Sequence, residues 1–529
     1  MKRKLWTLLL ALGAALALCV GASATDFTGW TALMDAHSGH ALADGNYYLN
    51  NDVTISQTIT VSGTITLDLN GHVLQYKNDN TKGSVIVIEN GGQLTIQDSD
   101  PDAPHKFDPN SDGLWVLDEA SGTETVTGGV ITGGTGYPYQ LYSTVNCGGG
   151  VYIAPGGQLT MTGGNIIGCS AEYGGGVCIY PKRDGEQGQF SMSGGSIIGC
   201  SAESGGGVCA FGKFQMSGQA VIRSCTAGRT SFNCGGGVYV DGSFEMSGEA
   251  IIEGCQAIST PSSPSKGGGV HLANNTEFTL SGSAVIQNCK AVNSDGSGKA
   301  YGGGVSAANV RKITLAGSAR IADCIAANGS GLYITGSQMY PADYGKLLAN
   351  GGSVDGDVVL GDKDKNDGPC TITGSGGTVF NGKVTVTPGS TIESGTFNGE
   401  VINNGTISGG TFSGTVINGE DGTIAEGVSI PNLKFIVTFD NEGTRTTAII
   451  DNGVKLTAPA APTKEGYRFS GWYYDNSGSK AKWNFDTDTV TRAMTLTAKW
   501  VRTYTVTFET SGGSAVAPVT VDTGSTVTK

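Results

Sequence analysis

The sequence predicts an all-β chain, most of it folded as a parallel β-solenoid, and three observations lead to this prediction. Glycine supplies 86 of the 529 residues, more than twice its usual share of ~7%. The tetrapeptide Gly-Gly-Gly-Val recurs six times, and the short segments between the glycines alternate apolar with polar residues, which is the period of a strand. Each interior glycine would cost a helix about 1 kcal/mol relative to alanine, so a helical bundle is excluded.

The repeating unit contains three short strands separated by glycine turns. Gly-Gly-Gly-Val opens each unit, a pair of large apolar residues such as Phe244 and Met246 follows, and a cysteine closes it. A strand triplet that buries only one side cannot fold alone and must stack on its neighbours. The tetrapeptides begin at Gly148, Gly174, Gly205, Gly235, Gly267 and Gly302, and the closing cysteines are Cys169, Cys200, Cys225, Cys255, Cys289 and Cys324.

Alternation assigns each strand residue to the inside or the outside of the coil. Val238 and Val240 point inward and Tyr239 outward, which places one residue per coil in an outer column: Tyr152, Cys178, Cys209, Tyr239, His271, Ser306 and Tyr333. Exposed rings could stack on sugars or anchor a protein partner, so Tyr152, Tyr239, His271 and Tyr333 are candidate binding residues. Ordinary strand propensity also explains tyrosine there, and we favour that explanation. A second variable column is expected to face solvent: Ile167, Ile198, Arg223, Glu253, Gln287 and Ala322.

Cysteines fall into two sets. The six closing cysteines point inward, and neighbours in this ladder lie ~4.8 Å apart, within disulfide range. We nevertheless expect reduced thiols that pack as small apolar groups, because bridges between adjacent parallel strands are strained. Cys178 and Cys209 share an outward position on adjacent coils, within disulfide range, and are the candidate disulfide pair.

The repeats resemble the right-handed parallel β-helix of the pectate-lyase-like superfold and the repeats of polymorphic outer-membrane proteins. The latter alternate Gly-Gly-apolar-apolar with Phe-x-x-Asn, where this chain has Ile-x-x-Cys. Because of that departure the resemblance implies the fold and not the outer-membrane location. It implies a β-helix over residues 45–430, with shorter coils from Gly376, and an N-terminal cap over 25–44 in which Trp30 to Ala36 could form a helix.

Residues 431–501 resemble the Listeria–Bacteroides repeat, also called the internalin B-repeat, which implies a small β-grasp-like domain of bacterial surface proteins. The resemblance lies in Gly466-Tyr467-x-Phe469-x-Gly471-Trp472. Phe508 matches Phe439, so residues 502–529 are expected to be a truncated second copy, and the chain a fragment whose anchor lies beyond it.

Residues 1–24 are predicted to be a secretory signal peptide. Three basic residues precede an apolar run that ends at Ala22-Ser23-Ala24. A lipoprotein signal at Cys19 is disfavoured because Leu18 is bulky. Removal of Lys2, Arg3 and Lys4 takes the net charge from −14 to −17, which argues against a nucleic-acid partner. No other run is long enough to span a membrane, so we expect an exported monomer at the surface or cell wall of a bacterium.

One metal motif stands out. Asp108, Asn110, Asp112 and Glu119 fit the spacing of a calcium-binding loop. Neighbouring prolines and the lack of flanking helices favour a plain acidic loop, and no other cofactor is expected.

Catalytic signatures are missing from the sequence. The histidines form no His-Glu-x-x-His motif, and the outward columns show no stacked carboxylates of the kind that glycosidases use. We therefore expect an adhesin-like or structural surface protein that binds a host or environmental glycan or protein. The alternative is a β-helix polysaccharide lyase or glycoside hydrolase.

Overall fold

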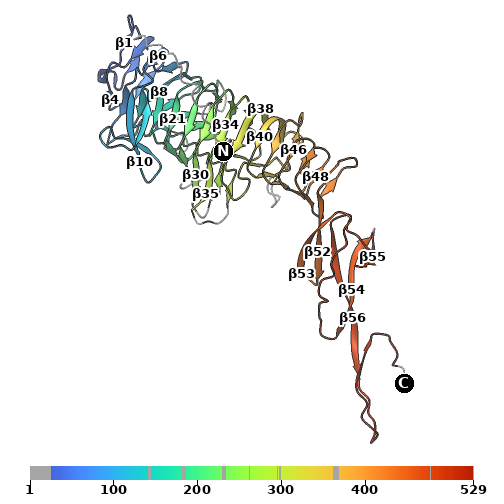
Figure 1. Ribbon diagram of the computed structural model, residues 1–529. Helices are drawn as coiled ribbons and strands as arrows, with labels where there is room; N and C mark the ends of the chain where they lie inside the picture. The colour runs from blue at the N-terminus through green and yellow to red at the C-terminus, as the bar shows by residue number, and fades with distance from the viewer. Residues whose placement is uncertain are drawn as a thin grey trace, which may run out of the picture.

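A computed structural model describes residues 25–140, 144–180, 186–228, 234–260, 263–294, 296, 299–361, 368–476 and 478–527. The predicted signal peptide lies outside these ranges. Within them the regular structure is β, apart from a three-residue 3-10 helix, η1 (Asp35–His37). Figure 1 shows a long rod of stacked strands from which a narrower C-terminal part continues at an angle. The all-β prediction is confirmed.

The rod has three strand columns, and in each column successive strands pair in parallel with the coils before and after. The first column contains β2 (Ala41–Leu42), β5 (Ile59–Val61), β8 (Ile86–Ile88), β16 (Val151–Ile153), β19 (Val177–Ile179), β23 (Val208–Ala210), β27 (Val238–Val240), β32 (Val270–Leu272), β37 (Val305–Ala307), β39 (Leu332–Ile334), β41 (Val358–Leu360), β44 (Val384–Val386), β47 (Val401–Asn403) and β50 (Val416–Asn418).

The second column contains β1 (Thr31–Ala32), β3 (Gly45–Tyr48), β6 (Thr64–Asp68), β9 (Gln93–Gln97), β17 (Gln158–Met161), β20 (Gln189–Met192), β24 (Lys213–Met216), β28 (Ser243–Met246), β33 (Glu277–Leu280), β38 (Lys312–Ala322), β40 (Lys346–Val354), β42 (Thr371–Thr373), β45 (Thr391–Ile392), β48 (Thr406–Ile407) and β51 (Thr423–Ile424).

The third column contains β4 (Val53–Ile55), β7 (Val73–Tyr76), β13 (Val130–Thr132), β18 (Asn165–Ile167), β21 (Ser196–Ile198), β25 (Val221–Arg223), β29 (Ile251–Glu253), β34 (Val285–Gln287), the later halves of β38 and β40, β43 (Val379–Phe380), β46 (Thr396–Phe397) and β49 (Thr411–Phe412).

Identical side chains stack along the interior because each coil repeats its neighbour in register. Phe190, Phe214, Phe244 and Phe278 are buried, with successive ring centroids 5.0, 4.7 and 5.0 Å apart. The six closing cysteines lie in the same core, as predicted. The shorter coils continue the arrangement: Phe380, Phe397 and Phe412 stack at 5.0 Å spacings.

The N-terminal cap differs from the prediction. The segment Trp30–Ala36 is not a helix of its own: Thr31 already pairs in parallel with Tyr47, and only Asp35–His37 is helical. Stacking therefore begins before residue 45. Leu33 is fully buried at this end, and Phe27 stacks on Tyr48 with centroids 4.1 Å apart, so apolar side chains close the first coil.

A three-stranded antiparallel sheet covers part of the third column. It consists of β10 (Pro104–Pro109), β11 (Trp115–Leu117) and β12 (Glu124–Thr127). Ile167 and Ile198, expected to face solvent, are instead buried with Trp115 beneath this sheet. Arg223, one coil further, places its guanidinium 5.3 Å from the Trp115 ring centroid. The insertion between coils thus converts an outer face into a second core.

A fourth group of short strands widens the middle of the rod. β22 (Ser201–Ala202), β26 (Thr226–Ala227), β30 (Gln256–Ser259) and β35 (Lys290–Asn293) form one small parallel sheet, and β31 (Ser265–Lys266) and β36 (Ala300–Tyr301) form another. β30 and β35 project from the side of the rod in Figure 1.

The C-terminal domain is a five-stranded sheet in the order β53, β52, β56, β54, β55, in which the central strand β56 pairs in parallel with β52. That central parallel pair gives a β-grasp-like arrangement. Its separate core includes Phe439, Trp472, Trp483 and Leu496. The strands are β52 (Leu433–Asn441), β53 (Thr444–Asp451), β54 (Tyr467–Asn476), β55 (Ser479–Lys482) and β56 (Met494–Val506).

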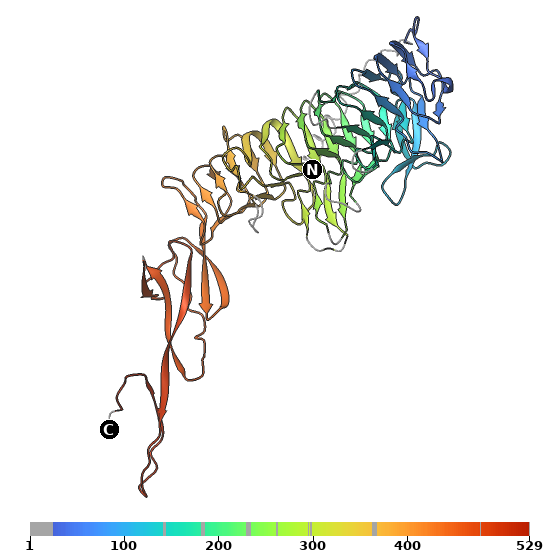
Figure 2. The same cartoon turned by 180° about the vertical axis from the view of Figure 1, so that it is seen from behind.

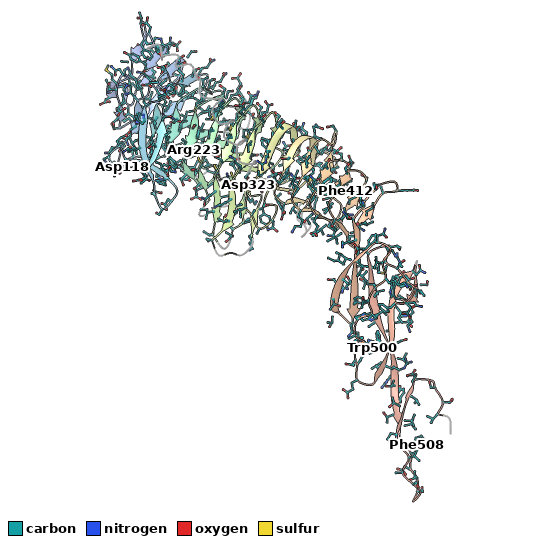
Figure 3. The ribbon with its side chains drawn as sticks, viewed as in Figure 1. Asp118, Arg223, Asp323, Phe412, Trp500 and Phe508 are labelled. Carbon is teal, nitrogen blue, oxygen red and sulfur yellow. The ribbon has the colours of Figure 1, made fainter. Side chains whose placement is uncertain are left out.

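Strand pairing continues across both boundaries of this domain. β52 pairs in parallel with β50, the last strand of the first column, with Val416 opposite Leu433. β56 runs past residue 502 and pairs with β57 (Val519–Asp522) of the second copy, and Arg468 forms an ion pair with Asp522. Figure 2 shows this continuity from behind, and Trp500 and Phe508 follow one another along the extension in Figure 3.

Candidate functional site

The outer column does not form the exposed surface that the sequence predicted. Tyr152, Tyr239 and His271 point out of the coil, as expected, but each is only 3% exposed. The hairpin of β14 (Tyr137–Gln140) and β15 (Thr144–Cys147) covers Tyr152, and Tyr239 packs against Phe211 of a neighbouring turn. The Tyr137 ring stacks on Tyr152 with centroids 5.1 Å apart. The expected exposure of these three side chains was therefore wrong, and their role in binding stays a prediction.

His271 shows the effect of this burial most clearly. Its Nδ1–H donates to the backbone carbonyl of Ser306 (3.2 Å), and its ring lies 5.7 Å from that of Tyr239. Burial, with a smaller contribution from Lys266, lowers the pKa of the imidazole to about 3. The side chain is therefore neutral at physiological pH.

Tyr333 differs from the other three because the column is uncovered at its position. It is half-buried, and its ring lies 4.8 Å from that of Tyr301 at an interplanar angle of 58°. Tyr301 belongs to β36, on a different side of the coil, and its proximity could not be deduced from the period of the first column.

Cys178 and Cys209 lie opposite one another on β19 and β23, as predicted, and both are fully buried. The structure represents them as thiols, like the other cysteines in its described part. Cys147 of the covering hairpin contacts Cys178, and hydrogen bonding to Cys178 followed by burial raises the pKa of Cys147. The disulfide between Cys178 and Cys209 stays a prediction.

The four residues of the calcium motif are not brought together. Asp108 accepts hydrogen bonds from the backbone and hydroxyl of Thr123 (2.9 and 2.8 Å), whereas Glu119 Oε1 lies 2.7 Å from His105 Nδ1. Asn110 accepts the backbone N–H groups of Asp112 and Leu114 at 2.8 and 3.0 Å. Asn110 and Asp112 lie at the tip of the β10–β11 hairpin, whereas Asp108 belongs to β10 and Glu119 follows β11. Across the described ranges, no group of three or more His, Cys, Asp or Glu side chains is arranged to hold a metal ion.

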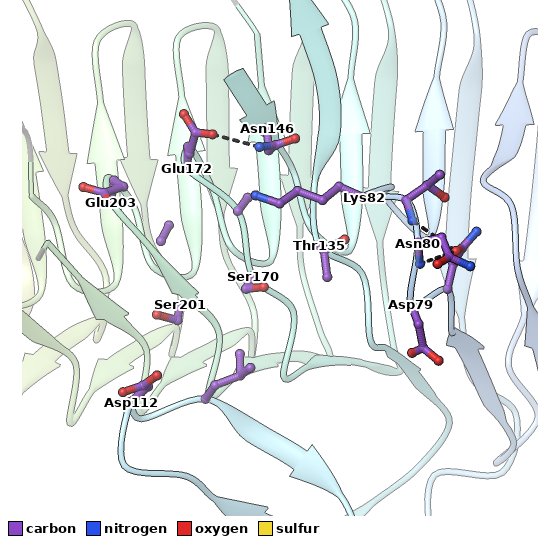
Figure 4. A pocket seen from close by; sticks show the side chains of 15 residues that line it. Asp79, Asn80, Lys82, Asp112, Thr135, Asn146, Ser170, Glu172, Ser201 and Glu203 are labelled. Atoms are coloured by element: carbon purple, nitrogen blue, oxygen red, sulfur yellow. Dashed lines mark hydrogen bonds between the residues drawn. The ribbon is translucent and has the colours of Figure 1, made fainter. Parts of the chain in front are cut away.

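Asp112 instead lines a groove of about 650 Å³ on the outside of the rod, which we call the acidic groove. One wall is the segment between β7 and β8, the second is the hairpin tip at Asp112 and Leu114, and the floor comes from the turns of two successive coils (Figure 4). Its lining residues are Asn78, Asp79, Asn80, Thr81, Lys82, Asp112, Leu114, Thr135, Asn146, Ser170, Ala171, Glu172, Ser201, Ala202 and Glu203.

Local hydrogen bonds position these side chains. Thr135 and Gly83 exchange two hydrogen bonds (2.8 and 3.2 Å), which attach the first wall to the coil. Asn146, 9% exposed, donates to Glu172 Oε1 at 2.8 Å. The Lys82 side chain extends across the groove towards Asn146 in Figure 4. Four carboxylates and one ammonium thus face the hollow, which favours ligands with hydroxyl or cationic groups.

Two of these carboxylates lie on successive coils. The backbone N–H of Glu203 donates to the carbonyl of Glu172 (3.1 Å), so the two side chains leave equivalent positions of neighbouring coils, which stack ~4.8 Å apart. This spacing between the coils is close to the roughly 5 Å that separates the two carboxyl groups of retaining glycosidases. The sequence prediction missed this pair because Glu172 and Glu203 lie in turns between strands, outside the alternating positions. The paired Cys-Ser-Ala-Glu segments that start at Cys169 and Cys200 are the signal that could have revealed them.

The C-terminal part of the chain matches a known repeat family. Residues 435–499 and 504–529 match the sequence profile of the Listeria-Bacteroides repeat domain. Over 98 residues the chain is 41% identical to a protein of Evansella cellulosilytica provisionally named a membrane protein, and 39% identical to another from that bacterium, provisionally named a glycine-rich membrane protein. Over 88 residues it is 36% identical to Internalin H of Listeria monocytogenes.

These matches cover 16 to 18% of this chain and 11 to 16% of the relatives. The chain thus combines a parallel β-solenoid with a C-terminal part that is similar to one Listeria–Bacteroides repeat and to part of a second. In the residues that the structure describes, no helix is long and apolar enough to cross a membrane.

Proposed function

We propose that this chain is an exported bacterial surface protein that acts by binding, in an adhesin-like or structural role, with a glycan or protein as its ligand. The observation that carries the proposal is the strand pairing between β50 and β52, which joins the solenoid to the repeat domain without a free linker. A rigid rod on a repeat-built stalk holds a binding surface at a fixed distance from the cell. The 36% sequence identity to Internalin H over 88 residues supports the surface location.

The acidic groove is the best candidate for the ligand site of this rod. Its volume of about 650 Å³ falls within the roughly 300–1,000 Å³ of small-ligand sites. Carboxylate, amide and hydroxyl groups from the coil turns and the two walls can bond several hydroxyls of a glycan at once. The repetitive backbone beneath them is fixed by stacking, so little ordering is needed on binding.

A retention assay tests this proposal. The chain without residues 1–24 is passed over immobilised host and plant glycans, and over intact host cells for protein ligands. We expect retention that falls in a Glu172→Gln, Glu203→Gln double variant and persists in Glu249→Gln, a matched change at an exposed glutamate of the rod. Failure of the wild-type chain to bind any of these surfaces would contradict the binding role.

Surface location is tested separately, because it does not depend on the ligand. Protease treatment of intact cells that express the chain should remove it, whereas a cytosolic marker should survive. Protection of the chain in intact cells would refute the proposed location.

The second candidate function is glycan cleavage, and the pair Glu172 and Glu203 is the observation that favours it. Incubation with the retained glycans should release no reducing ends if the chain only binds. Release that disappears in both Glu172→Gln and Glu203→Gln would replace the binding proposal with a hydrolase.

A further inference from the structure

We propose that a second hollow, beside Tyr301 and Tyr333, binds one ring of an uncharged sugar. We call it the tyrosine hollow; it is lined by Tyr301, Ala327, Asn328, Gly329, Tyr333, Asp357, Val359, Lys383, Thr385 and Thr387. The tyrosine hollow is separate from the acidic groove. The inference rests on the proposed function, because a sugar is one of the ligand classes proposed there.

The two tyrosine rings give this hollow an aromatic wall. Their centroids lie 4.8 Å apart and their planes are tilted by 58°, so the rings form an open angle rather than a closed stack. The electron-rich face of an aromatic ring attracts the C–H groups of a flat apolar surface, and a pyranose presents such a face. The volume of about 170 Å³ is below the ~300 Å³ where drug-sized sites begin, which suits one ring.

Polar groups among the other lining residues complete the site. Asp357 Oδ1 accepts the backbone N–H of Lys383 at 3.0 Å, and its Oδ2 lies 3.9 Å from Lys383 Nζ. Both side chains remain nearly half exposed, so each can still bond a hydroxyl. Because the carboxylate and the ammonium offset one another, the hollow has no net charge. It therefore favours an uncharged hydroxylated ligand over a cation or an anion.

The position of the hollow follows from the side chains that precede and follow it on the rod. Towards the N-terminus the same region is filled by packed rings, for example Phe211 between Tyr173 and Tyr239 at 5.9 Å from each. On the two coils after Tyr333 the equivalent positions hold Val359 and Thr385, whose side chains are smaller. The space that the Phe211 ring fills on an earlier coil is thus left open beside Tyr333, where the following coils have only Val359 and Thr385.

The experiment uses three probes: methyl β-D-glucopyranoside, methyl β-D-galactopyranoside and methyl N-acetyl-β-D-glucosaminide. Saturation-transfer NMR on the chain without residues 1–24 should show transfer to the ring protons of at least one probe. Tyr301→Ala and Tyr333→Ala should each weaken binding roughly tenfold, whereas Tyr333→Phe should retain it. The control Tyr340→Ala removes a tyrosine that is 56% exposed and does not line the hollow.

Absence of transfer to all three glycosides would refute the sugar site beside Tyr301 and Tyr333. Equal binding by wild type and Tyr301→Ala would also refute it, provided that both proteins melt at the same temperature. If Tyr301→Ala has a lower melting temperature than wild type, the variants Tyr333→Phe and Asp357→Asn replace it in the test. Loss of glycoside binding in Tyr333→Phe together with retained binding in Asp357→Asn would contradict the stacking geometry. Tighter binding of methylguanidinium than of any glycoside would assign the hollow to a cation.

Failure here is distinguishable from failure of the proposed function. Wild-type chain that is retained on glycans through Glu172 and Glu203, but shows no transfer to the methyl glycosides, would leave the surface-binding role intact. Conversely, the chain could show transfer to the glycosides and yet be protected from protease in intact cells. That result would support the tyrosine hollow and refute the proposed surface location.

Discussion

Substitution of Gly236 by alanine should disrupt the stacking of the coils. Gly236 is the second glycine of its Gly-Gly-Gly-Val corner. A methyl group there would lie 2.3 Å from the backbone oxygen of Gly268 on the next coil and 2.5 Å from the backbone carbon and oxygen of Gln256. All three atoms belong to backbone, and the N–H of Gly236 is bonded to Gly267 O at 2.9 Å. The neighbours therefore cannot yield without breaking the ladder.

A matched variant isolates this steric effect. Gly254→Ala, on the same coil, places its methyl group 3.9 Å from the nearest atoms, but at a φ of +61°. It should cost roughly 1–2 kcal/mol from the left-handed backbone alone. Gly236→Ala should cost about 3 kcal/mol or more, the upper range for overpacking.

Hydrogen exchange measured by mass spectrometry checks the difference where it should appear. Each coil contacts only its neighbours, so the loss is expected to be local. Peptides that contain β27 and β32 should exchange roughly tenfold faster in Gly236→Ala than in Gly254→Ala, while peptides that contain β47 and β50 should be unchanged. Equal exchange in the two variants would show that the corner does not require glycine for close approach.

Four further predictions concern the core, pH, the thiols and calcium. Phe244→Ala should lower the free energy of unfolding by about 4 kcal/mol in urea titration, because it removes a buried ring stacked on both sides; a loss below 1 kcal/mol would contradict the stack. The pKa of His271 is about 6.5 in the unfolded chain and about 3 in the folded chain, so the stability that its neutral form contributes is complete above pH 6.5 and is lost as the pH falls towards 3. The free energy of unfolding, measured by urea titration between pH 7 and pH 4, should therefore depend less on pH in His271→Gln than in wild type. Identical pH profiles of the two proteins would refute this. Alkylation of the unfolded, unreduced chain lacking residues 1–24 should modify nine of eleven cysteines if Cys178 and Cys209 are bridged, and modification of all eleven would exclude the bridge. Millimolar calcium should leave the melting temperature unchanged in wild type and in Asp108→Ala; an increase in wild type alone would restore the calcium site.

The interior of the rod was predictable because the sequence repeats the local geometry of every coil. Phe244, Met246 and Cys255 recur at equivalent positions, and alternation alone assigns them to the core. The outer faces were not predictable in the same way. Trp115 covers Ile167 and the β14–β15 hairpin covers Tyr152, and both covers are insertions outside the repeat. A period describes which residues share a column, but it contains no information about which column a non-repeating segment covers.

The candidate sites were predictable only in part, for the same reason. Tyr333 was identified from its column, whereas its partner Tyr301 lies after an insertion of variable length. The acidic groove combines Asp79, Asp112, Glu172 and Glu203 from separate turns. These turns are brought together by the winding of the chain and not by any spacing within one segment.

The pairing of β50 with β52 determines how this molecule carries mechanical load. A pull on the C-terminal repeats acts along β56 and β52 and reaches the rod through the parallel contact of Val416–Asn418 with Leu433–Phe435. Hydrogen bonds of a parallel pair that are pulled along the strand direction are loaded together, whereas pulling across them would open them one at a time. Tension along β52 would therefore load this junction in shear, and the angle between the rod and the tail in Figure 1 would turn part of that tension into a torque on the last coils.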